Sequence, residues 1–244
     1  MKYIEMKPFF DYLDAQFKAK SIYCLGGQGE IVGKMTVDFV CSHENSLANA
    51  ARVFKHVANV ITDKEFKRNL AMIFDCSGLG SHWFQKEKVY SYDHTANAMY
   101  KETVPIPVDK RQPGDFVFGH FSEGKAGHVG YLEDNDMVVE AKGRDDGVVK
   151  RKYTEGDWTK VGRPFFWIYN MKRDLKNGNT GKDVGQLQAR LTALGYPCGT
   201  IDNIFGAKTE KAVKEFQADN YKKAPNPGVM DKKTATKLGF TYSS

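Results

Sequence analysis

The chain of 244 residues lacks a long apolar run. No stretch approaches the roughly 18 consecutive apolar residues of a membrane-spanning helix. Residues 1–20 interleave acidic and basic side chains, where a secretion signal needs an uninterrupted apolar segment. We therefore expect neither membrane insertion nor a signal peptide.

Cysteine is scarce, and histidine does not occur in metal-binding patterns. The four cysteines, Cys24, Cys41, Cys76 and Cys198, are too scattered for a disulfide framework and form no C-x-x-C pair. The six histidines include no H-E-x-x-H motif and no zinc-finger spacing. These absences disfavour a metalloenzyme, and we expect reduced thiols and no cofactor.

The charge is basic and unevenly distributed. Lys and Arg number 36 against 30 Asp and Glu, a net charge of +6. Residues 171–244 contain 13 Lys and Arg and 7 Asp and Glu, whereas residues 1–170 contain 23 of each. The whole excess therefore lies in the last 74 residues. Such a charge either attracts an anionic partner or belongs to an ordinary solvated surface.

The first segment has helical patterns followed by strand patterns. Apolar residues recur at helical spacing over 9–17 and 46–61. After Pro113, short β-branched and aromatic runs bounded by Gly and Asp predict five strands. These lie at 115–119, 128–133, 137–141, 147–151 and 164–169. Helices followed by a meander of strands indicate an α+β domain.

The second segment is helical. A polar stretch at 171–182 predicts a linker between a domain at 1–170 and a module at 183–244. Leu187, Leu191 and Leu194 form a helical stripe that ends at Gly195. A weak internal echo places Thr209 and Thr234 ahead of similar apolar helix positions. We expect a small helical module.

The most distinctive local string is D-C-S-G at 75–78, which follows an apolar run. A helix that begins at this point would place Cys76 near free backbone N–H groups, which favour a thiolate. In this interpretation Asp75 caps the helix and is not a catalytic acid. The alternative is a buried cysteine that only fills space.

A second string, G-H-V-G-Y at 127–131, favours the catalytic interpretation. His128 follows Cys76 in the order of Cys-His hydrolases, and two glycines flank it. Glu140 interrupts an apolar strand twelve residues later and can reach His128 if the strands pair antiparallel. His120 is the weaker candidate base. The run from Trp158 to Tyr169 favours a core strand over a sugar-stacking surface.

These strings, with G-D-F-V-F at 114–118, resemble the NlpC-type papain-like peptidases that cut bacterial cell-wall peptides. The resemblance covers residues 21–169. It implies that Cys76 is the nucleophile, His128 the general base and Glu140 the orienting residue, where the family more often has histidine. Tyr23, ahead of Gly26 and Gly27, is implied to line the oxyanion site. The mostly helical stretch of about fifty residues between Tyr23 and Cys76 is expected to form one wall of the substrate groove.

Residues 174–238 resemble the three-helix peptidoglycan-binding domain that accompanies many wall hydrolases. Asp202, Phe205, Thr209 and Gln217 occupy motif positions there. They either contact the ligand or serve as turn and cap residues, and the sequence leaves both roles open.

A chain that combines these two domains resembles a bacteriophage endolysin. The two resemblances predict a papain-like α+β domain, with N-terminal helices packed on an antiparallel sheet, followed by a small all-α three-helix module. We expect a monomer that binds peptidoglycan and not nucleic acid. It would be made in a host cytoplasm and reach the wall once the membrane is permeabilised. Stem-peptide endopeptidase activity is favoured, and the alternatives are an N-acetylmuramoyl-L-alanine amidase or a catalytically dead wall-binding protein.

Overall fold

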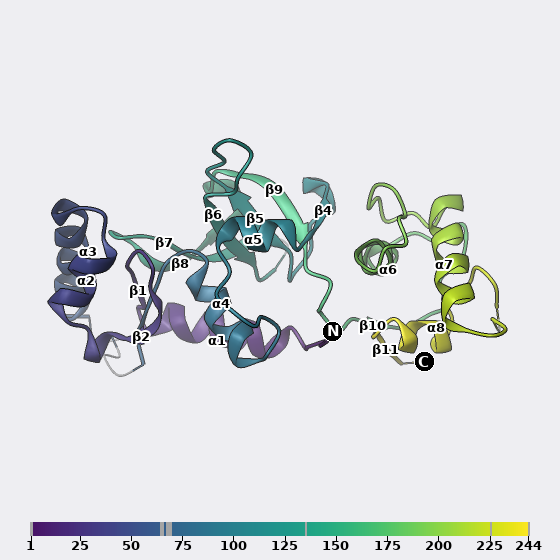
Figure 1. Cartoon of the computed structure of the whole chain (residues 1–244), viewed down its shortest axis with the longest axis horizontal. Helices are drawn as coiled ribbons and strands as arrows, with labels where there is room; N and C mark the ends of the chain where they lie inside the picture. The colour runs from purple at the N-terminus through teal and green to yellow at the C-terminus, as the bar shows by residue number, and fades with distance from the viewer. Residues whose placement is uncertain (1, 64–65, 67–69, 135, 225, 244) are drawn as a thin grey trace. The chain divides into compact units, whose positions relative to one another are not determined.

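The computed structural model describes residues 2–63, 66, 70–134, 136–224 and 226–243. The chain divides into two compact units, each built from discontinuous segments (Figure 1). The sheet unit comprises Lys7–Lys101 and Phe116–Thr159. The helical unit comprises Met1–Met6, Glu102–Asp115 and Lys160–Ser244.

The sheet unit alternates helices and short strands. Its helices are α1 (Lys7–Lys18), α2 (Val37–His43), α3 (Leu47–Val60), α4 (Gly78–Lys86) and α5 (Ala96–Lys101). Its strands are β1 (Ile22–Tyr23), β2 (Gln28–Ile31), β3 (Met72–Phe74), β5 (Phe116–Gly119), β6 (His128–Leu132), β7 (Met137–Gly143), β8 (Gly147–Lys152) and the first two residues of β9 (Trp158–Arg163). Short 3₁₀ turns lie at Val32–Lys34 and Tyr153–Glu155.

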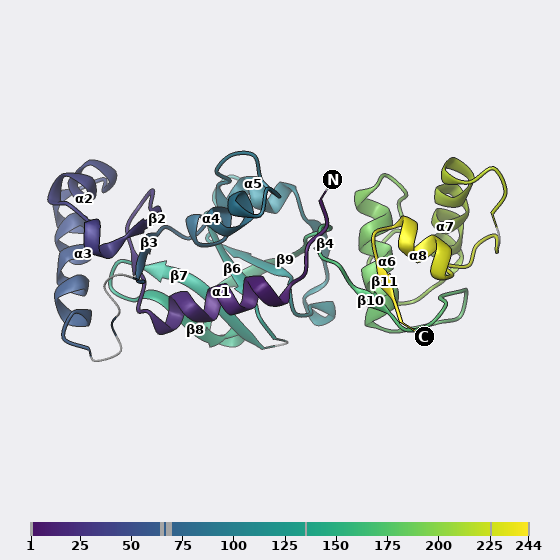
Figure 2. The same cartoon turned by 90° about the horizontal axis from the view of Figure 1, so that it is seen from below.

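The main sheet of this unit runs in the order β9-β5-β6-β7-β8. Strands β5 to β8 pair antiparallel as a meander, as the sequence predicts. Helix α1 packs on β7 and β8 (Figure 2). The ring of Phe9 on α1 lies 5.3 Å from the Tyr131 ring of β6 and 4.8 Å from the Phe84 ring of α4. These contacts confirm a papain-like arrangement of helices on an antiparallel sheet.

A second, three-stranded sheet in the order β1-β3-β2 joins the main body to helices α2 and α3. Thr36 and Ser46 begin these helices, each accepting a hydrogen bond from the backbone N–H three residues on. Val40, Ala50 and Val53 form a small core with the strands. The helix predicted at 46–61 is therefore present as α3.

The helical unit contains α6 (Lys182–Ala193), α7 (Ala207–Asn220) and α8 (Lys232–Lys237). Strand β4 (Val104–Ile106) pairs antiparallel with the end of β9, and β10 (Asn170–Met171) pairs parallel with β11 (Thr241–Tyr242). A 3₁₀ turn lies at Val108–Lys110. The three helices agree with the predicted module.

Residues 171–182, expected to form a linker, contribute to the packing of this unit. Leu175 is fully buried and exchanges two backbone hydrogen bonds with Met230, of 3.0 and 2.8 Å. Met171 is also buried within its pairing to β11. This mostly polar segment therefore contains two buried apolar side chains, Met171 and Leu175, which anchor it.

The prediction of a strand at 164–169 is wrong. Strand β9 covers 158–163 and ends before Pro164, which has no N–H to donate to a sheet. The aromatic residues beyond it pack in an irregular segment, where the indole of Trp167 donates to the carbonyl of Gly114 at 2.8 Å. Within the described part of the chain, no helix combines the length and apolar character needed to cross a membrane.

Candidate active site

Cys76 lies in the turn between strand β3 and helix α4, two residues before the helix begins at Gly78. The Asp75 carboxylate accepts a hydrogen bond from the N–H of Gly78 at 2.7 Å, and the Asp75 carbonyl accepts one from Leu79 at 3.3 Å. These bonds hold Asp75 against the start of α4, where Ser77 occupies the N-cap position, and they satisfy the N–H groups of Gly78 and Leu79.

Neighbouring strands bring His128 and Glu140 together. Strands β6 and β7 pair antiparallel with Tyr131 opposite Val139, so Glu140 lies diagonally across from His128 on the same face. Nε2 of His128 lies 2.5 Å from Oε2 of Glu140, and both side chains are buried. The Sγ of Cys76 lies 3.9 Å from the carbonyl oxygen of Gly127, the residue before His128, and the Cys76 side chain is close enough to raise the pKa of His128. The structure therefore groups Cys76, His128 and Glu140.

The charges of this group reinforce one another. Burial lowers the pKa of His128, but hydrogen bonds with Cys76 and Glu140 and their negative charges raise it overall to about 9. Burial raises the pKa of Glu140, yet the bonds and charges of His128 and Arg151 hold it below its ordinary value. At neutral pH the ring is then protonated and the carboxylate ionised. An imidazolium next to a cysteine favours the thiolate.

Arg151, which the sequence analysis does not single out, is the second partner of Glu140. It lies on β8 opposite Val138, diagonal to Glu140. Its Nε donates to Oε1 of Glu140 at 2.5 Å, and its Nη1 donates to the carbonyl of Glu155. Both carboxylate oxygens of Glu140 are thus engaged, one by the catalytic candidate His128 and one by a fixed cation.

Two aromatic rings stack on His128. The Trp158 ring lies 5.5 Å from the imidazole centroid at 11° between planes, and the His120 ring lies 5.1 Å away at 22°. Trp158 is thus a neighbour of the candidate base, and His120 packs against that base instead of replacing it.

Glycines make the room for this stack. A Cβ on Gly130 would lie 2.9 Å from the Trp158 ring, and one on Gly156 would lie 2.1 Å from the indole nitrogen. A Cβ on Gly127 would lie 2.6 Å from the carbonyl oxygen of His120. The glycines that flank His128 in the sequence are therefore the signal that could have revealed both neighbours.

Tyr23 reaches the same place through parallel strand pairing. Tyr23 on β1 lies opposite Phe74 on β3, and the N–H of Cys24 donates to the Phe74 carbonyl at 3.1 Å. Burial, followed by the negative charges of Cys76 and Asp75, raises the pKa of the Tyr23 hydroxyl, which therefore keeps its proton. Tyr23 therefore lies near the start of α4, although about fifty residues separate it from Cys76 in the sequence.

The four motif residues of the helical unit are not equivalent. Phe205 and Gln217 are buried, and Gln217 donates to the carbonyls of Asn226 and Val229 and to the Thr234 hydroxyl. Asp202 and Thr209 both accept from Gln188 and line a pocket of about 310 Å³. Phe205 and Gln217 thus have packing roles, Thr209 is equally buried beside the pocket, and Asp202 is the partly exposed member of the four.

Comparison with known families agrees with both halves of this description. Residues 63–163 match the model of the NlpC/P60 family, and residues 180–238 match a model described as "Putative peptidoglycan binding domain". The chain carries an NlpC/P60 domain followed by a peptidoglycan-binding domain. These domain matches agree with the predicted two-part architecture.

Individual relatives are similar over parts of their length. "Probable endopeptidase p60" of Listeria seeligeri is 36% identical over 75 residues, which is 31% of this chain and 14% of that protein. "Probable CtpA-like serine protease" of Staphylococcus epidermidis is 33% identical over 106 residues, 36% of this chain and 21% of that protein. The P60 domain of a Mycobacterium avium subspecies paratuberculosis antigen is 19% identical with a TM-score of 0.40, covering 64% of this chain and 95% of that domain. The chain thus spans about a fifth or less of these two curated relatives.

The segment between Tyr23 and Cys76 is anchored to the rest of the NlpC/P60 domain by a buried ion pair. Glu44, at the end of α2, accepts from the N–H of Leu25 at 3.0 Å and pairs with Arg144 at 2.7 Å. The Arg144 guanidinium lies 5.4 Å from the ring centroid of Tyr23. Helices α2 and α3 are therefore tied to the strand that carries Tyr23, and their predicted role as a groove wall stays a prediction.

Among the described residues, no three His, Cys, Asp or Glu side chains are arranged to hold a metal ion. Cys198, in the peptidoglycan-binding domain, is a buried thiol whose pKa burial raises to about 12. Among the free thiols, Cys76 is the one whose side chain raises the pKa of His128.

Proposed function

We propose that the chain is a cysteine peptidoglycan hydrolase that cleaves an amide bond in the stem peptide of the cell wall. The observation that carries the proposal is the grouping of three side chains: His128 lies 2.5 Å from Glu140, Cys76 contacts the adjoining Gly127 carbonyl, and both Cys76 and Glu140 raise the pKa of His128 to about 9. Such a ring stabilises a thiolate before substrate binds and holds a proton ready for the leaving group.

In the proposed reaction the Cys76 thiolate attacks the amide carbonyl carbon. Backbone N–H groups near Cys76 and the protonated Tyr23 hydroxyl stabilise the oxyanion. His128 then donates its proton to the amine as the C–N bond breaks, which leaves a thioester on Cys76. Water, deprotonated by His128, attacks the thioester and releases the acid and the free thiolate–imidazolium pair. Glu140 keeps the ring oriented throughout.

Endopeptidase activity is favoured over amidase activity by the Listeria seeligeri relative, described as an endopeptidase and 36% identical over 75 residues. Digestion of purified walls followed by mass analysis of the products distinguishes the two reactions. We expect fragments cut within the stem peptide. Release of intact stem peptides from the glycan would instead assign the amidase reaction.

A Cys76→Ala variant tests the mechanism against a dead wall-binding protein. We expect it to lose the ability to clear a wall suspension, with a fall of at least a thousandfold, while it still pellets with the walls. A Cys41→Ala variant, which removes an exposed thiol, serves as the control and should keep full activity. Equal clearing by native chain and Cys76→Ala would refute cysteine catalysis.

We further propose that the peptidoglycan-binding domain holds the enzyme on the wall, with Asp202 and Thr209 at a candidate ligand pocket. Substituting Asp202 and Thr209 with Ala should reduce pelleting with walls. The same protein should still cleave soluble wall peptides at the native rate. Undiminished pelleting would assign both residues to structure alone.

The phage-endolysin role, a monomeric state and synthesis in a host cytoplasm rest on the sequence pattern and stay predictions. Expression inside a Gram-positive cell tests the first of these. We expect lysis only when the membrane is permeabilised at the same time. Lysis of intact expressing cells without permeabilisation would contradict that role.

A further inference from the structure

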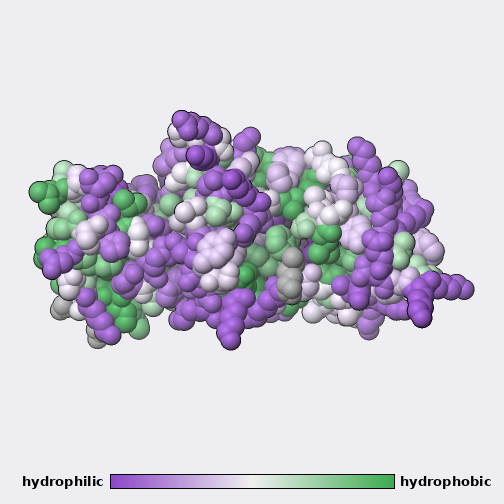
Figure 3. Space-filling view, in the orientation of Figure 1, coloured by the Kyte–Doolittle hydropathy of each residue, from purple (hydrophilic) through white to green (hydrophobic). Residues whose placement is uncertain are grey.

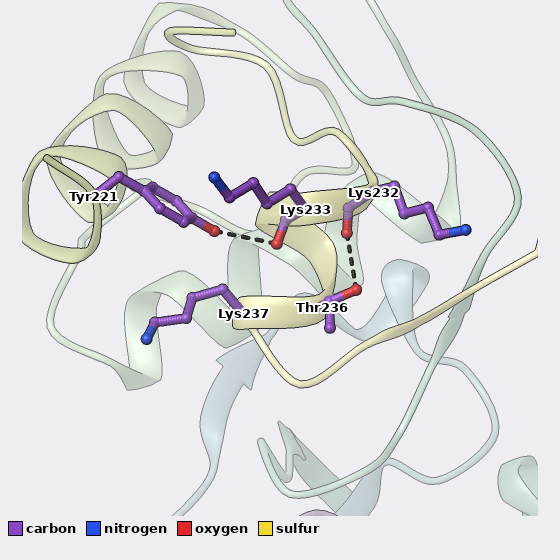
Figure 4. A pocket seen from close by; sticks show the side chains of 5 residues that line it. All are labelled: Tyr221, Lys232, Lys233, Thr236 and Lys237. Atoms are coloured by element: carbon purple, nitrogen blue, oxygen red, sulfur yellow. Dashed lines mark hydrogen bonds between the residues drawn. The ribbon is translucent and has the colours of Figure 1, made fainter. Parts of the chain in front are cut away.

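The helical unit has an open hollow of about 610 Å³ on the outer side of α8. Its lining consists of Tyr221, Lys232, Lys233, Thr236 and Lys237, and we call it the lysine pocket (Figure 4). It shares no residue with the pocket that Asp202 and Thr209 line. The two hollows are therefore separate candidate sites on the same domain.

The tyrosine that floors this pocket is held in place. Its hydroxyl donates to the backbone carbonyl of Lys233 at 3.1 Å, and the Lys233 ammonium lies 5.0 Å from the ring centroid. In Figure 4 the side chains of Lys233 and Lys237 extend on the same side as the Tyr221 ring, while Lys232 extends away from it. The pocket thus combines a fixed aromatic face with two neighbouring ammonium groups.

Among the described residues, the lysines of this pocket have no acidic partner, whereas two lysines of α7 do. On α7, Lys211 pairs with Glu215 and Lys214 pairs with Glu210. No described acidic side chain forms such a pair with the three pocket lysines. The nearby Asp231 is occupied as the cap of α8, accepting from Thr234 at 2.8 Å and from Asn226 at 2.8 Å.

Most of the basic excess of the chain is concentrated here. Residues 221–237 contain five lysines and one aspartate, a net charge of +4, against +6 for the whole chain. Hydrophilic side chains cover the α7 side of the unit in Figure 3. Unpaired ammonium groups that converge near one hollow raise the local concentration of anions.

We propose that the lysine pocket binds the phosphodiester groups of an anionic cell-wall polymer, a partner distinct from the peptide that Cys76 would cleave. A compact ammonium group suits phosphate, and the Tyr221 face can cover the carbon units between successive phosphates. The choice of a wall polymer rests on the proposed function, since the wall is the surface that the enzyme must hold.

The test uses the full chain with Cys76→Ala, so that walls are not digested. Binding is measured on intact walls and on walls treated with hydrofluoric acid, which breaks phosphodiester bonds and leaves peptidoglycan. The substitutions Lys233→Gln and Lys237→Gln are compared with Lys211→Gln and Lys214→Gln, which change the net charge equally. We expect the pocket pair to weaken binding to intact walls by about tenfold and to flatten its salt dependence by roughly one to two in log–log slope.

On extracted walls, the pocket variant and its parent should bind equally. Equal weakening by both pairs of substitutions would show a general field and overturn the proposal, as would the same loss on extracted walls. Weakened binding to duplex DNA with unchanged wall binding would assign the pocket to nucleic acid. Cleavage of soluble wall peptides is measured with the pocket variant that retains Cys76. Because this activity depends only on the proposed hydrolase function, the measurement separates the two proposals.

Discussion

At the scale of single residues, the main electrostatic demand comes from Glu140. Its side chain is fully buried, and a buried carboxylate is costly unless it is paired and hydrogen-bonded. Here His128 and Arg151 each approach one oxygen at 2.5 Å. Arg151 is positioned to keep Glu140 ionised and in place, and this in turn supports the protonated ring of His128.

Removing Arg151 should therefore change both rate and pH profile. We expect Arg151→Ala to lower kcat roughly ten- to a hundredfold, with little change in KM. Without the arginine, burial should raise the pKa of Glu140, so the acid limb of kcat/KM should move to higher pH. A carboxyl pKa that is lower in the folded than in the unfolded state stabilises the fold at pH above the unfolded pKa, and this stability is lost as pH falls through the folded pKa. Arg151→Ala should also reduce this contribution.

Two variants control that measurement. Lys150→Ala removes the adjacent cation of β8, which pairs with Glu133 and Asp14 and not with Glu140, and should leave the profile unchanged. Arg151→Lys keeps the charge and should recover part of the rate. If Arg151→Ala kept the native pH profile while only its melting temperature fell, the arginine would be purely structural.

The sequence singles out Cys76, His128 and Glu140 as candidates, because each stands out from its local pattern. Arg151 does not, since it lies between Lys150 and Lys152 in a uniformly basic strand end. Only the pairing of β7 with β8 distinguishes it from these neighbours. The position of Trp158 likewise depends on contacts between strands that no periodicity encodes.

At the scale of elements, Gly78 and Gly80 at the start of α4 allow this helix to approach the strands closely. A Cβ on Gly78 would lie 2.1 Å from the Gly27 carbonyl, and one on Gly80 would lie 2.3 Å from the Tyr131 hydroxyl. The Tyr131 hydroxyl also accepts from the N–H of Gly80 at 3.1 Å. These contacts fix the start of the helix that follows Cys76.

The strands predicted after Pro113 are present where alternation and turn residues mark them. Pairing between β1 and β3 could not be predicted, because these two-residue and three-residue strands lie about fifty residues apart and contain too few residues for a pattern. The opposite error occurs after Pro164. The apolar aromatic residues there predict a strand, but the chain packs irregularly.

The weak internal echo of the helical unit has a physical basis in two glutamines. Gln188 on α6 holds the loop at Asp202 and Ile204 and bonds the Thr209 hydroxyl. Gln217 on α7 does the same for the loop at 226–229 and for Thr234. Each glutamine thus fixes a loop and the start of the next helix.

Replacing Gln217 with Ala should destabilise this unit strongly. Two carbonyls, a hydroxyl and the N–H of Gly228 would lose a buried partner, at a cost of about 2–4 kcal/mol. Calorimetry of the full chain should show the transition of this unit at lower temperature. Glu215→Ala on the same helix breaks only an exposed pair and should cost less than about 1 kcal/mol. Similar effects of the two substitutions would refute this account of the echo.

At the scale of the whole molecule, the boundary between units does not follow the chain. The helical unit takes up 102–115 and 160–170 in addition to the predicted module. Arg190 on α6 connects three segments of the helical unit. Its guanidinium donates to the carbonyls of Trp167 and Leu238 and lies 4.1 Å from the ring centroid of Tyr3. The peptidoglycan-binding domain therefore supports segments that precede the predicted linker.

A chain that ends at Thr180 should consequently be less stable than a simple two-domain division implies. It would lose Arg190 and Met230 and expose Trp167, Met171 and Leu175, which are buried in the full chain. Each such side chain contributes about 1.5–3 kcal/mol when buried, so we expect the melting temperature to fall by roughly 10 °C or more. Below that temperature the truncated chain should still cleave soluble wall peptides. An unchanged melting temperature would show that residues 171–182 act as a free linker, as their polar composition first indicates.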